Sequence, residues 1–169
     1  AQQTIGRLNA IDKPYAVLTN DASKLPQTAA RRYQGFGLRI DPDLIITSAS
    51  LLKNHFENNN LQDARCIVLG PDDSVQYVIE AGGKVVSPGN GFDVLVICDE
   101  ADFPFVETVD TVLTELFHKV ERQEQFHLIL HNHDLIYPKA NRGFGVTSRS
   151  IALIFEAALQ LRYPGRANL

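Results

Sequence analysis

The sequence of 169 residues contains no Met and no Trp, only two Cys, and no run of basic residues. Its 16 Lys and Arg are outnumbered by 20 Asp and Glu, which gives a net charge of −4. Binding to the phosphate backbone of nucleic acids needs a clustered basic surface, so we expect no nucleic-acid partner. No apolar run approaches the roughly 18 residues that span a bilayer. We therefore expect no membrane partner either.

The two cysteines, Cys66 and Cys98, each lie within a short apolar segment. This position predicts buried thiols rather than a disulfide or a metal ligand. Free thiols are typical of a reducing compartment, and the first residues lack the charged and apolar regions of a secretory signal. We therefore predict a cytoplasmic protein.

What the sequence does contain is an alternation of short apolar strands with helical patterns, in a chain that is 44% hydrophobic and 21% charged. The predicted strands span 15–19, 44–47, 66–69, 84–86, 93–98 and 126–130. The predicted helices span 5–11, 26–36, 48–56, 73–81, 103–122 and 148–161. A loop rich in Pro and Gly is expected from Asn132 to Gly145. Such alternation indicates an α/β fold built on a parallel sheet.

A polar segment rich in Asn, residues 57–63, separates two stretches that each have this α/β pattern. Polar segments of this kind are typical of loops between structural units. We therefore predict two domains, residues 1–60 and residues 61–169.

The first candidate site follows the first predicted strand. Thr19, Asn20, Asp21 and Ser23 stand between this strand and the next helix. Ligands of open α/β sheets bind beyond the carboxyl ends of strands, and hydroxyl, amide and backbone N–H groups gathered there bind anions. The alternative is that these residues only form a turn and a helix cap.

A second candidate follows the last strand. His127, His131 and His133 would share one face of an extended segment, with Asp134 beside them. Imidazoles and a carboxylate could hold zinc or iron, although the spacing matches no standard metal motif. The alternative is a polar loop that faces a substrate.

Further acidic residues, Asp99, Glu100 and Asp102, follow the most hydrophobic strand. Two of these carboxylates could form an acid/base pair or bind Mg²⁺. The alternative is that Asp102 stands at the amino end of the long helix, where a negative charge complements the helix dipole. Gly143 and Gly145 do not complete a dinucleotide-binding motif, so no nicotinamide cofactor is predicted.

The segment from Lys13 to Ser23 resembles the second motif of the haloacid dehalogenase (HAD) superfamily. The similarity is to the subgroup with a large α/β cap, which includes the NagD-type and p-nitrophenyl phosphatases. Four further segments with this resemblance follow in the family's order: 43–48, 68–70, 131–138 and 145–158. The resemblance implies part of a Rossmann-like parallel-sheet core in residues 1–60 and an α/β cap in residues 61–169.

The same resemblance implies roles for individual residues. Thr19, Asn20 and Asp21 would bind the phosphate, and Asn132 and Asp134 would face the leaving group of the substrate. The family's Thr-Asn-Asn reads Thr-Asn-Asp at 19–21 here, and its Thr-Asn-Pro-Asp cap loop reads His-Asn-His-Asp at 131–134. These departures bear on substrate preference.

The resemblance places the family's nucleophilic and acid/base aspartates before Ala1, and its stabilising Lys and Mg²⁺ ligands after Leu169. We therefore expect no catalytic residue and no metal ligand within these residues. The function implied is that of a Mg²⁺-dependent phosphatase. It would hydrolyse a small phosphate monoester, such as a sugar phosphate, a nucleotide or p-nitrophenyl phosphate, through a phospho-aspartate, with a homodimer as a possible assembly. The chain alone is expected to be inactive. The alternative is a non-catalytic α/β module that binds a phosphorylated ligand or a partner protein.

Overall fold

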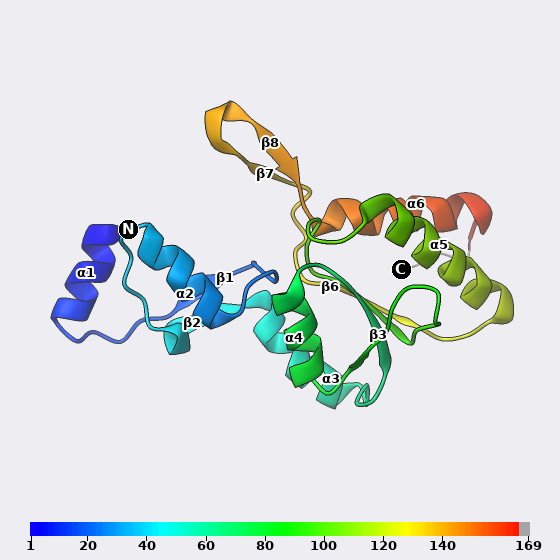
Figure 1. Ribbon diagram of the computed structural model, residues 1–169, viewed down its shortest axis with the longest axis horizontal. Coiled ribbons are helices and arrows are strands. Elements are labelled where there is room, and N and C mark those ends of the chain that lie inside the picture. Colours follow the sequence, from blue (N-terminus) through cyan, green and yellow to red (C-terminus); the bar gives the residue numbers. More distant parts are fainter. Residues whose placement is uncertain (166–169) are drawn as a thin grey trace.

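A computed structural model describes residues 1–165 and divides them into a smaller and a larger lobe that lie side by side (Figure 1). The smaller lobe holds α1 (Gln2–Ala10), β1 (Val17–Thr19), α2 (Pro26–Gly35), the 3-10 helix η1 (Pro42–Leu44) and β2 (Ile45–Thr47). The larger lobe holds the rest of the described residues. Within the described residues, no helix is both long and apolar enough to span a membrane.

The smaller lobe is built on two short parallel strands. β1 pairs with β2 so that Val17 faces Ile45 and Thr19 faces Thr47, and α2 packs against β2. α2 begins with Pro26, whose fixed φ and missing N–H suit the first position of a helix. α1 has no buried residue. This lobe therefore has little core of its own.

The larger lobe is built on a four-stranded parallel sheet in the order β4-β3-β5-β6. Its strands are β3 (Arg65–Leu69), β4 (Lys84–Val85), β5 (Val94–Ile97) and β6 (His127–Leu130). All four residues of β5 are buried, as expected for a continuous apolar run at the centre of a parallel sheet. The alternation predicted from the sequence thus gives the expected α/β fold.

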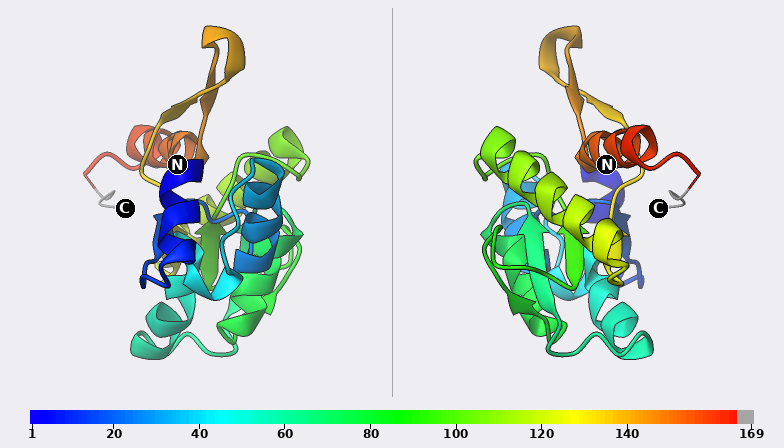
Figure 2. Two further views of the ribbon diagram at one scale, coloured as in Figure 1. Left: turned by 90° about the vertical axis from the view of Figure 1, so that its left-hand side faces the viewer. Right: turned by 90° about the vertical axis from the view of Figure 1, so that its right-hand side faces the viewer.

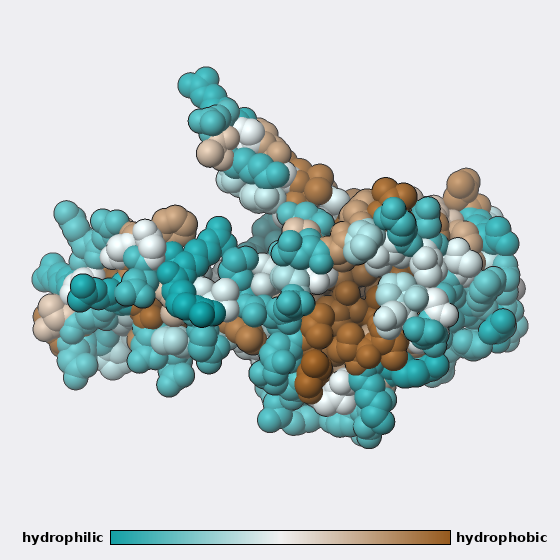
Figure 3. Space-filling view, viewed as in Figure 1, coloured by the Kyte–Doolittle hydropathy of each residue, from teal (hydrophilic) through white to brown (hydrophobic). Residues whose placement is uncertain are grey.

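Helices cover both faces of this sheet (Figure 2). They are α3 (Leu52–Asn58) and α4 (Asp72–Glu80) on one face, and α5 (Phe105–Arg122) and α6 (Ser148–Arg162) on the other. Because side chains alternate along a strand, Val94 and Val96 pack under the first pair, while Leu95 and Ile97 pack under the second. Both cysteines are free and buried, as predicted. On the face seen in Figure 3, apolar surface gathers on the larger lobe between α4 and α5.

The prediction of a loop from Asn132 to Gly145 is wrong in one respect, because this segment contains an antiparallel hairpin. β7 (Ile136–Pro138) pairs with β8 (Phe144–Val146), and a 3-10 turn, η3 (Ala140–Arg142), connects them. The hairpin projects from the junction of the lobes (Figure 1). Gly145 lies opposite Tyr137, and a Cβ there would come within 2.5 Å of the tyrosine ring. The absence of a side chain at Gly145 therefore leaves room for the Tyr137 ring.

Two helix predictions need correction. The helix expected at 48–56 begins as a 3-10 turn, η2 (Ser48–Leu51), before α3. Thr47 and Ser50 cap that turn by reciprocal hydrogen bonds. The long helix begins at Phe105, and Asp102 does not cap it: Pro104 is at the N-cap position without a side-chain hydrogen bond, and Asp102 has a φ of +66°. Two intervening residues separate Asp102 from the helix.

Candidate functional site

A cleft of about 550 Å³ lies between the two lobes. It is lined by segments that follow the carboxyl ends of β1, β5 and β6, and by the hairpin. The polar residues in its wall are Thr19, Asn20, Asp21, Ser23, Lys24, Arg32, Tyr33, Asp99, Glu100, Asn132, Asp134, Tyr137, Thr147 and Ser148. All five residues predicted to bind phosphate or to face the leaving group are among them. A hollow of about 630 Å³ lies between α2 and the segment that precedes β2, where Ile40 and Asp41 line it, at the opposite end of β2 from the cleft.

The segment after β1 forms a turn around Asp21. The Asp21 carboxylate accepts hydrogen bonds from the backbone N–H of Ser23, at 2.8 Å, and from its hydroxyl, at 2.7 Å. The backbone N–H of Asp21 donates to Thr19 Oγ1 at 3.2 Å. The turn anticipated as the alternative therefore exists, and it aligns the same side chains along the cleft.

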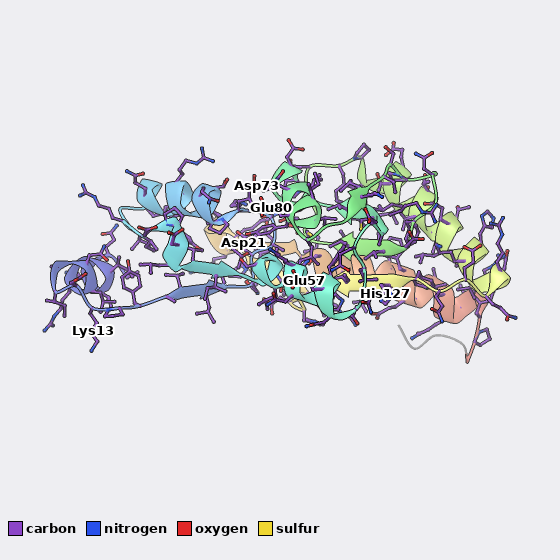
Figure 4. The ribbon with its side chains drawn as sticks, turned by 90° about the horizontal axis from the view of Figure 1, so that it is seen from below. Lys13, Asp21, Glu57, Asp73, Glu80 and His127 are labelled. Carbon is purple, nitrogen blue, oxygen red and sulfur yellow. The ribbon has the colours of Figure 1, made fainter. Side chains whose placement is uncertain are left out.

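The other Asp21 carboxylate oxygen faces two cations. Lys24 Nζ lies 4.0 Å from it and Arg32 Nη1 lies 3.8 Å from it. Figure 4 places Asp21 at the junction of the lobes, while Lys13 lies at the far end of the smaller lobe. Asp21 therefore holds positive charge beside the cleft.

Asn20 connects the two lobes. Its amide nitrogen Nδ2 donates to Asn132 Oδ1 at 3.1 Å and to Asp134 Oδ2 at 2.8 Å. These contacts join residues more than 110 positions apart in the sequence. The predicted phosphate ligand and the two residues predicted to face the leaving group therefore meet at one place.

The loop of residues 132–134 is itself held in shape by hydrogen bonds. The backbone N–H of Asp134 donates to Asn132 Oδ1 at 2.9 Å. Two hydroxyls at the start of α6 support the loop from behind: Ser148 donates to the Asn132 carbonyl at 3.4 Å, and Thr147 donates to the Asp134 carbonyl. Thr147 and Ser148 are both buried, so this support is shielded from water.

Of the acidic residues after β5, Asp99 and Glu100 line the cleft. Burial, and then the neighbouring Asp99, raise the pKa of the Glu100 carboxyl. Asp99 accepts a hydrogen bond from the backbone N–H of Ala101 at 3.1 Å. Asp102 does not line this cleft, so the structure does not bring it together with Asp99 there.

The described residues do not assemble a metal site. Among residues 1–165, no three side chains of the His, Cys, Asp or Glu type are grouped to hold a metal ion. The alternative zinc site is therefore wrong: His127 and His133 are exposed, whereas His131 Nε2 is buried. The Mg²⁺ implied by the family resemblance likewise lacks a fitting set of ligands in this part of the chain.

Sequence reasoning missed the residues of α4 that hold the segment after β1. The hydroxyl of Tyr77 donates to the Lys24 carbonyl at 3.0 Å and contacts Thr47 Oγ1 at 2.7 Å. Ser74 donates to the Ala22 carbonyl at 2.9 Å, and Asp73 accepts from the Leu25 backbone N–H at 2.9 Å. Burial raises the pKa of Tyr77, so its hydroxyl keeps its proton and serves as a donor.

Comparisons with known proteins agree with this fold. Residues 1–84 match the model of the haloacid dehalogenase-like hydrolases. A double mutant of the thermostable NPPase from Geobacillus stearothermophilus is 20% identical, with a TM-score of 0.75, and the match covers 95% of this chain and 60% of that chain. A possible sugar phosphatase from Cytophaga hutchinsonii is 23% identical, with a TM-score of 0.77, over 99% of this chain and 58% of that chain.

A third structure is the glycerol phosphate phosphatase of Mycobacterium tuberculosis in complex with magnesium. It is 16% identical, with a TM-score of 0.73, over 90% of this chain and 45% of that chain. No curated protein matches the chain by sequence. The chain thus spans about three fifths of the length of the first structures it matches. The fold likeness extends over nearly the whole chain and the family model matches residues 1–84, so the resemblance to the haloacid dehalogenase-like hydrolases is confirmed.

Proposed function

We propose that the cleft binds a small phosphate monoester as part of a Mg²⁺-dependent phosphatase. Thr19 and Asn20 hold the phosphoryl group, and Asn132 and Asp134 face the leaving group. The observation that carries the proposal is the meeting of Asn20 with Asn132 and Asp134 at 3.1 and 2.8 Å. A sugar phosphate, a nucleotide or an aryl phosphate such as p-nitrophenyl phosphate would suit a cleft of about 550 Å³.

The hydrogen-bonding capacity of the turn supports this assignment. Thr19 Oγ1 accepts from the Asp21 N–H, which leaves the hydroxyl proton free to donate to a phosphate oxygen. Asp21 contributes indirectly, because its carboxylate holds Lys24 and Arg32 beside the cleft. Phosphoryl transfer depends mostly on positioning and on neutralising charge, which donors and cations so placed supply.

The unpaired edge of β1 supports the proposal that the core of the protein has more strands than residues 1–165 contain. Within residues 1–165, β1 pairs only with β2, and Leu18 is 76% exposed. Parallel strands are normally buried on both faces. We propose that residues 1–60 belong to the phosphatase core and residues 61–169 to its cap, with η2 and α3 as the part of the core that packs on the sheet of the larger lobe. A further strand carrying the nucleophilic aspartate would add beside β1, next to Thr19. Mg²⁺ would supply charge neutralisation during transfer, and we assign it no ligand within residues 1–165.

Phosphate titration of the 169-residue chain tests the binding part of this proposal. We expect inorganic phosphate to bind and Asn20→Ala to weaken binding about tenfold, since the variant loses the amide whose hydrogen bonds hold the loop of residues 132–134 beside Thr19, and a hydrogen bond to a charged group contributes about 1.5 kcal/mol. The matched control is Asn9→Ala, because Asn9 lies on α1 outside the cleft. Equal affinities of Asn20→Ala and the unaltered chain would remove Asn20 from the site.

Turnover tests the catalytic part. We expect no Mg²⁺-dependent hydrolysis of p-nitrophenyl phosphate by these 169 residues, and turnover would show that the nucleophile lies within them. The intact mass of the protein from its natural source separates the phosphatase from the alternative, a binding module. A mass well above 18.8 kDa supports flanking core segments, whereas 18.8 kDa together with phosphate binding favours the module.

A further inference from the structure

The two walls of the cleft carry opposite charges. On the wall that follows β1, Lys24 Nζ and Arg32 Nη1 lie 4.0 and 3.8 Å from one carboxylate oxygen of Asp21, so two cations face one acid. On the wall of the larger lobe, the charged side chains that line the cleft are all carboxylates: Asp99, Glu100 and Asp134. The cleft is therefore cationic at the turn after β1 and acidic opposite it.

The acidic wall is formed by two neighbouring strand ends. β5 and β6 run parallel, and Ile97 pairs with Leu130 at their carboxyl ends. Asp99 and Glu100 follow the first of these strands directly, as the loop of residues 132–134 follows the second. Because neighbouring strands lie about 4.8 Å apart, the two acids stand beside the loop that we propose to face the leaving group.

No cation of the protein neutralises this wall by a close contact. Among the described residues, none of Asp99, Glu100 and Asp134 forms an ion pair with a Lys or Arg. Asp99 accepts a hydrogen bond from the Ala101 backbone N–H at 3.1 Å, and Asp134 accepts one from the Asn20 amide at 2.8 Å. Both donors are uncharged. A ligand in the cleft would therefore meet the negative charge of this wall.

The Glu100 carboxyl already experiences a negative neighbour. Burial, and then the charge of Asp99, raise its pKa, and the opposing effect of Lys139 is smaller. Lys139 belongs to the hairpin, where its Nζ lies 5.3 Å from the centre of the Tyr137 ring. A further anion beside Glu100 would add to this repulsion, whereas a cation would relieve it.

We propose that Asp99 and Glu100 select the leaving group by charge, favouring one that carries an ammonium group and rejecting one that carries a second acidic group. This selection rests on the proposed function, which places the phosphoryl group at Thr19 and the leaving group at the loop of residues 132–134. A carboxylate on the leaving group would lie against like charges, whereas an ammonium group would donate to the carboxylates. The substrate class is thus a phosphorylated amino alcohol or amino sugar rather than a phosphorylated acid.

Three esters of nearly equal size test this selection on the 169-residue chain. Phosphoethanolamine, hydroxyethyl phosphate and phosphoglycolate have cationic, neutral and anionic leaving groups. Calorimetry at pH 7 gives each dissociation constant, which is then divided by that of inorganic phosphate to remove effects on the phosphoryl group. We expect phosphoethanolamine to bind about tenfold more tightly than phosphoglycolate, the scale of one partly screened charge interaction, with the neutral ester between them.

Acid-to-amide variants assign the selection to the wall. Asp99→Asn combined with Glu100→Gln removes both charges, and the Asn carbonyl can still accept from the Ala101 N–H. The tenfold difference between the two charged esters should fall to less than about threefold. Glu57→Gln is the matched control, because Glu57 is an exposed acid of α3 outside the cleft (Figure 4) and should leave the difference unchanged. Each single variant replaces the double variant if the latter does not fold, and should remove part of the difference.

The outcomes separate the selection from the proposed function. Equal relative affinities of the three esters, or an unchanged difference in the folded variants, would overturn the selection while phosphate binding remained. Absence of binding of inorganic phosphate and of every ester would overturn the proposed function and the selection with it. A difference that narrows in the Asp99 and Glu100 variants but not in Glu57→Gln supports the proposal.

Discussion

The two lobes differ in how they bury their sheets. In the larger lobe, β5 is buried along its whole length between two pairs of helices. In the smaller lobe, the two-stranded sheet leaves Leu18 76% exposed, and α1 buries no residue at all. Burial of apolar area is the main favourable contribution to folding. The larger lobe therefore supplies most of the stability of this chain.

The candidate site belongs to both lobes, but its support comes from the larger one. Ala22 and Ala49, from the smaller lobe and the linking turn, pack in the same apolar cluster as Val78 of α4. Tyr77 and Ser74 of α4 hold the carbonyls of the segment after β1. A phosphate-binding turn on a weakly packed lobe is thus held in shape by the well-packed lobe. Changes in α4 should alter the site more than comparable changes in α1 do.

The largest expected effect follows from removing a buried side chain of the larger lobe. Phe155→Ala, at a fully buried position of α6, should lower the free energy of unfolding by about 3–5 kcal/mol. Leu18→Ala, in the smaller lobe, should change it by less than about 0.5 kcal/mol because that side chain is already exposed. Urea denaturation measures both. Similar losses in the two variants would contradict the division between the lobes.

The next largest effect is on the pH dependence of stability, and it comes from the titration of His131. The folded-state pKa of His131 is about 4, below the ordinary value of 6.5, so the unfolded chain binds the proton more readily. Stability is then complete above pH 6.5 and is lost as pH falls toward 4, by at most about 3 kcal/mol. His131→Asn lacks this titration. Its stability at pH 7 and pH 4.5 should therefore differ less than that of the unaltered chain, as measured by urea denaturation.

A smaller effect tests the support from α4. Tyr77→Phe removes the hydroxyl that serves Lys24 and Thr47 and should cost about 1–2 kcal/mol, because buried polar groups lose their partner. It should also weaken phosphate binding. The matched control is Tyr15→Phe, which removes a hydroxyl bonded to Asn9 on the surface of the smaller lobe and should leave both quantities nearly unchanged. A larger loss of stability or of phosphate binding in Tyr15→Phe than in Tyr77→Phe would contradict the inference that α4 supports the site.

The sequence was most informative where the pattern reflects burial. Residues 93–98 were predicted as a strand, and β5 occupies 94–97, because a central parallel strand needs an unbroken apolar run. The hairpin β7–β8 was missed because its apolar residues, such as Ile136 and Phe144, are exposed. No alternation of buried and exposed positions marks its strands in the sequence.

The residues of the candidate site likewise fall into those that the sequence could predict and those that it could not. Thr19, Asn20 and Asn132 could be found because residues after parallel strands gather at one edge of a sheet. Tyr77 could not, because a helical pattern marks it only as a core residue. The hydrogen bonds of Asn20 with Asn132 and Asp134 depend on how the two lobes are placed against each other, and no local pattern contains that information.

The smallest expected effect tests the corrected start of α5, the longest helix of the well-packed lobe. Glu107 lies in the first turn of α5, whereas Asp102 precedes the N-cap residue Pro104. Since the helix dipole acts only over the first turn, Glu107→Gln should lower stability by about 0.3–1 kcal/mol at low ionic strength. Asp102→Asn keeps a residue that tolerates positive φ and should cost less than half as much. Both variants replace an acid by its amide, so thermal unfolding at low and high salt compares them directly. The loss in Glu107→Gln should fade with salt. A larger salt-sensitive loss in Asp102→Asn would mean that the carboxylate before Pro104, and not the one in the first turn, stabilises the helix.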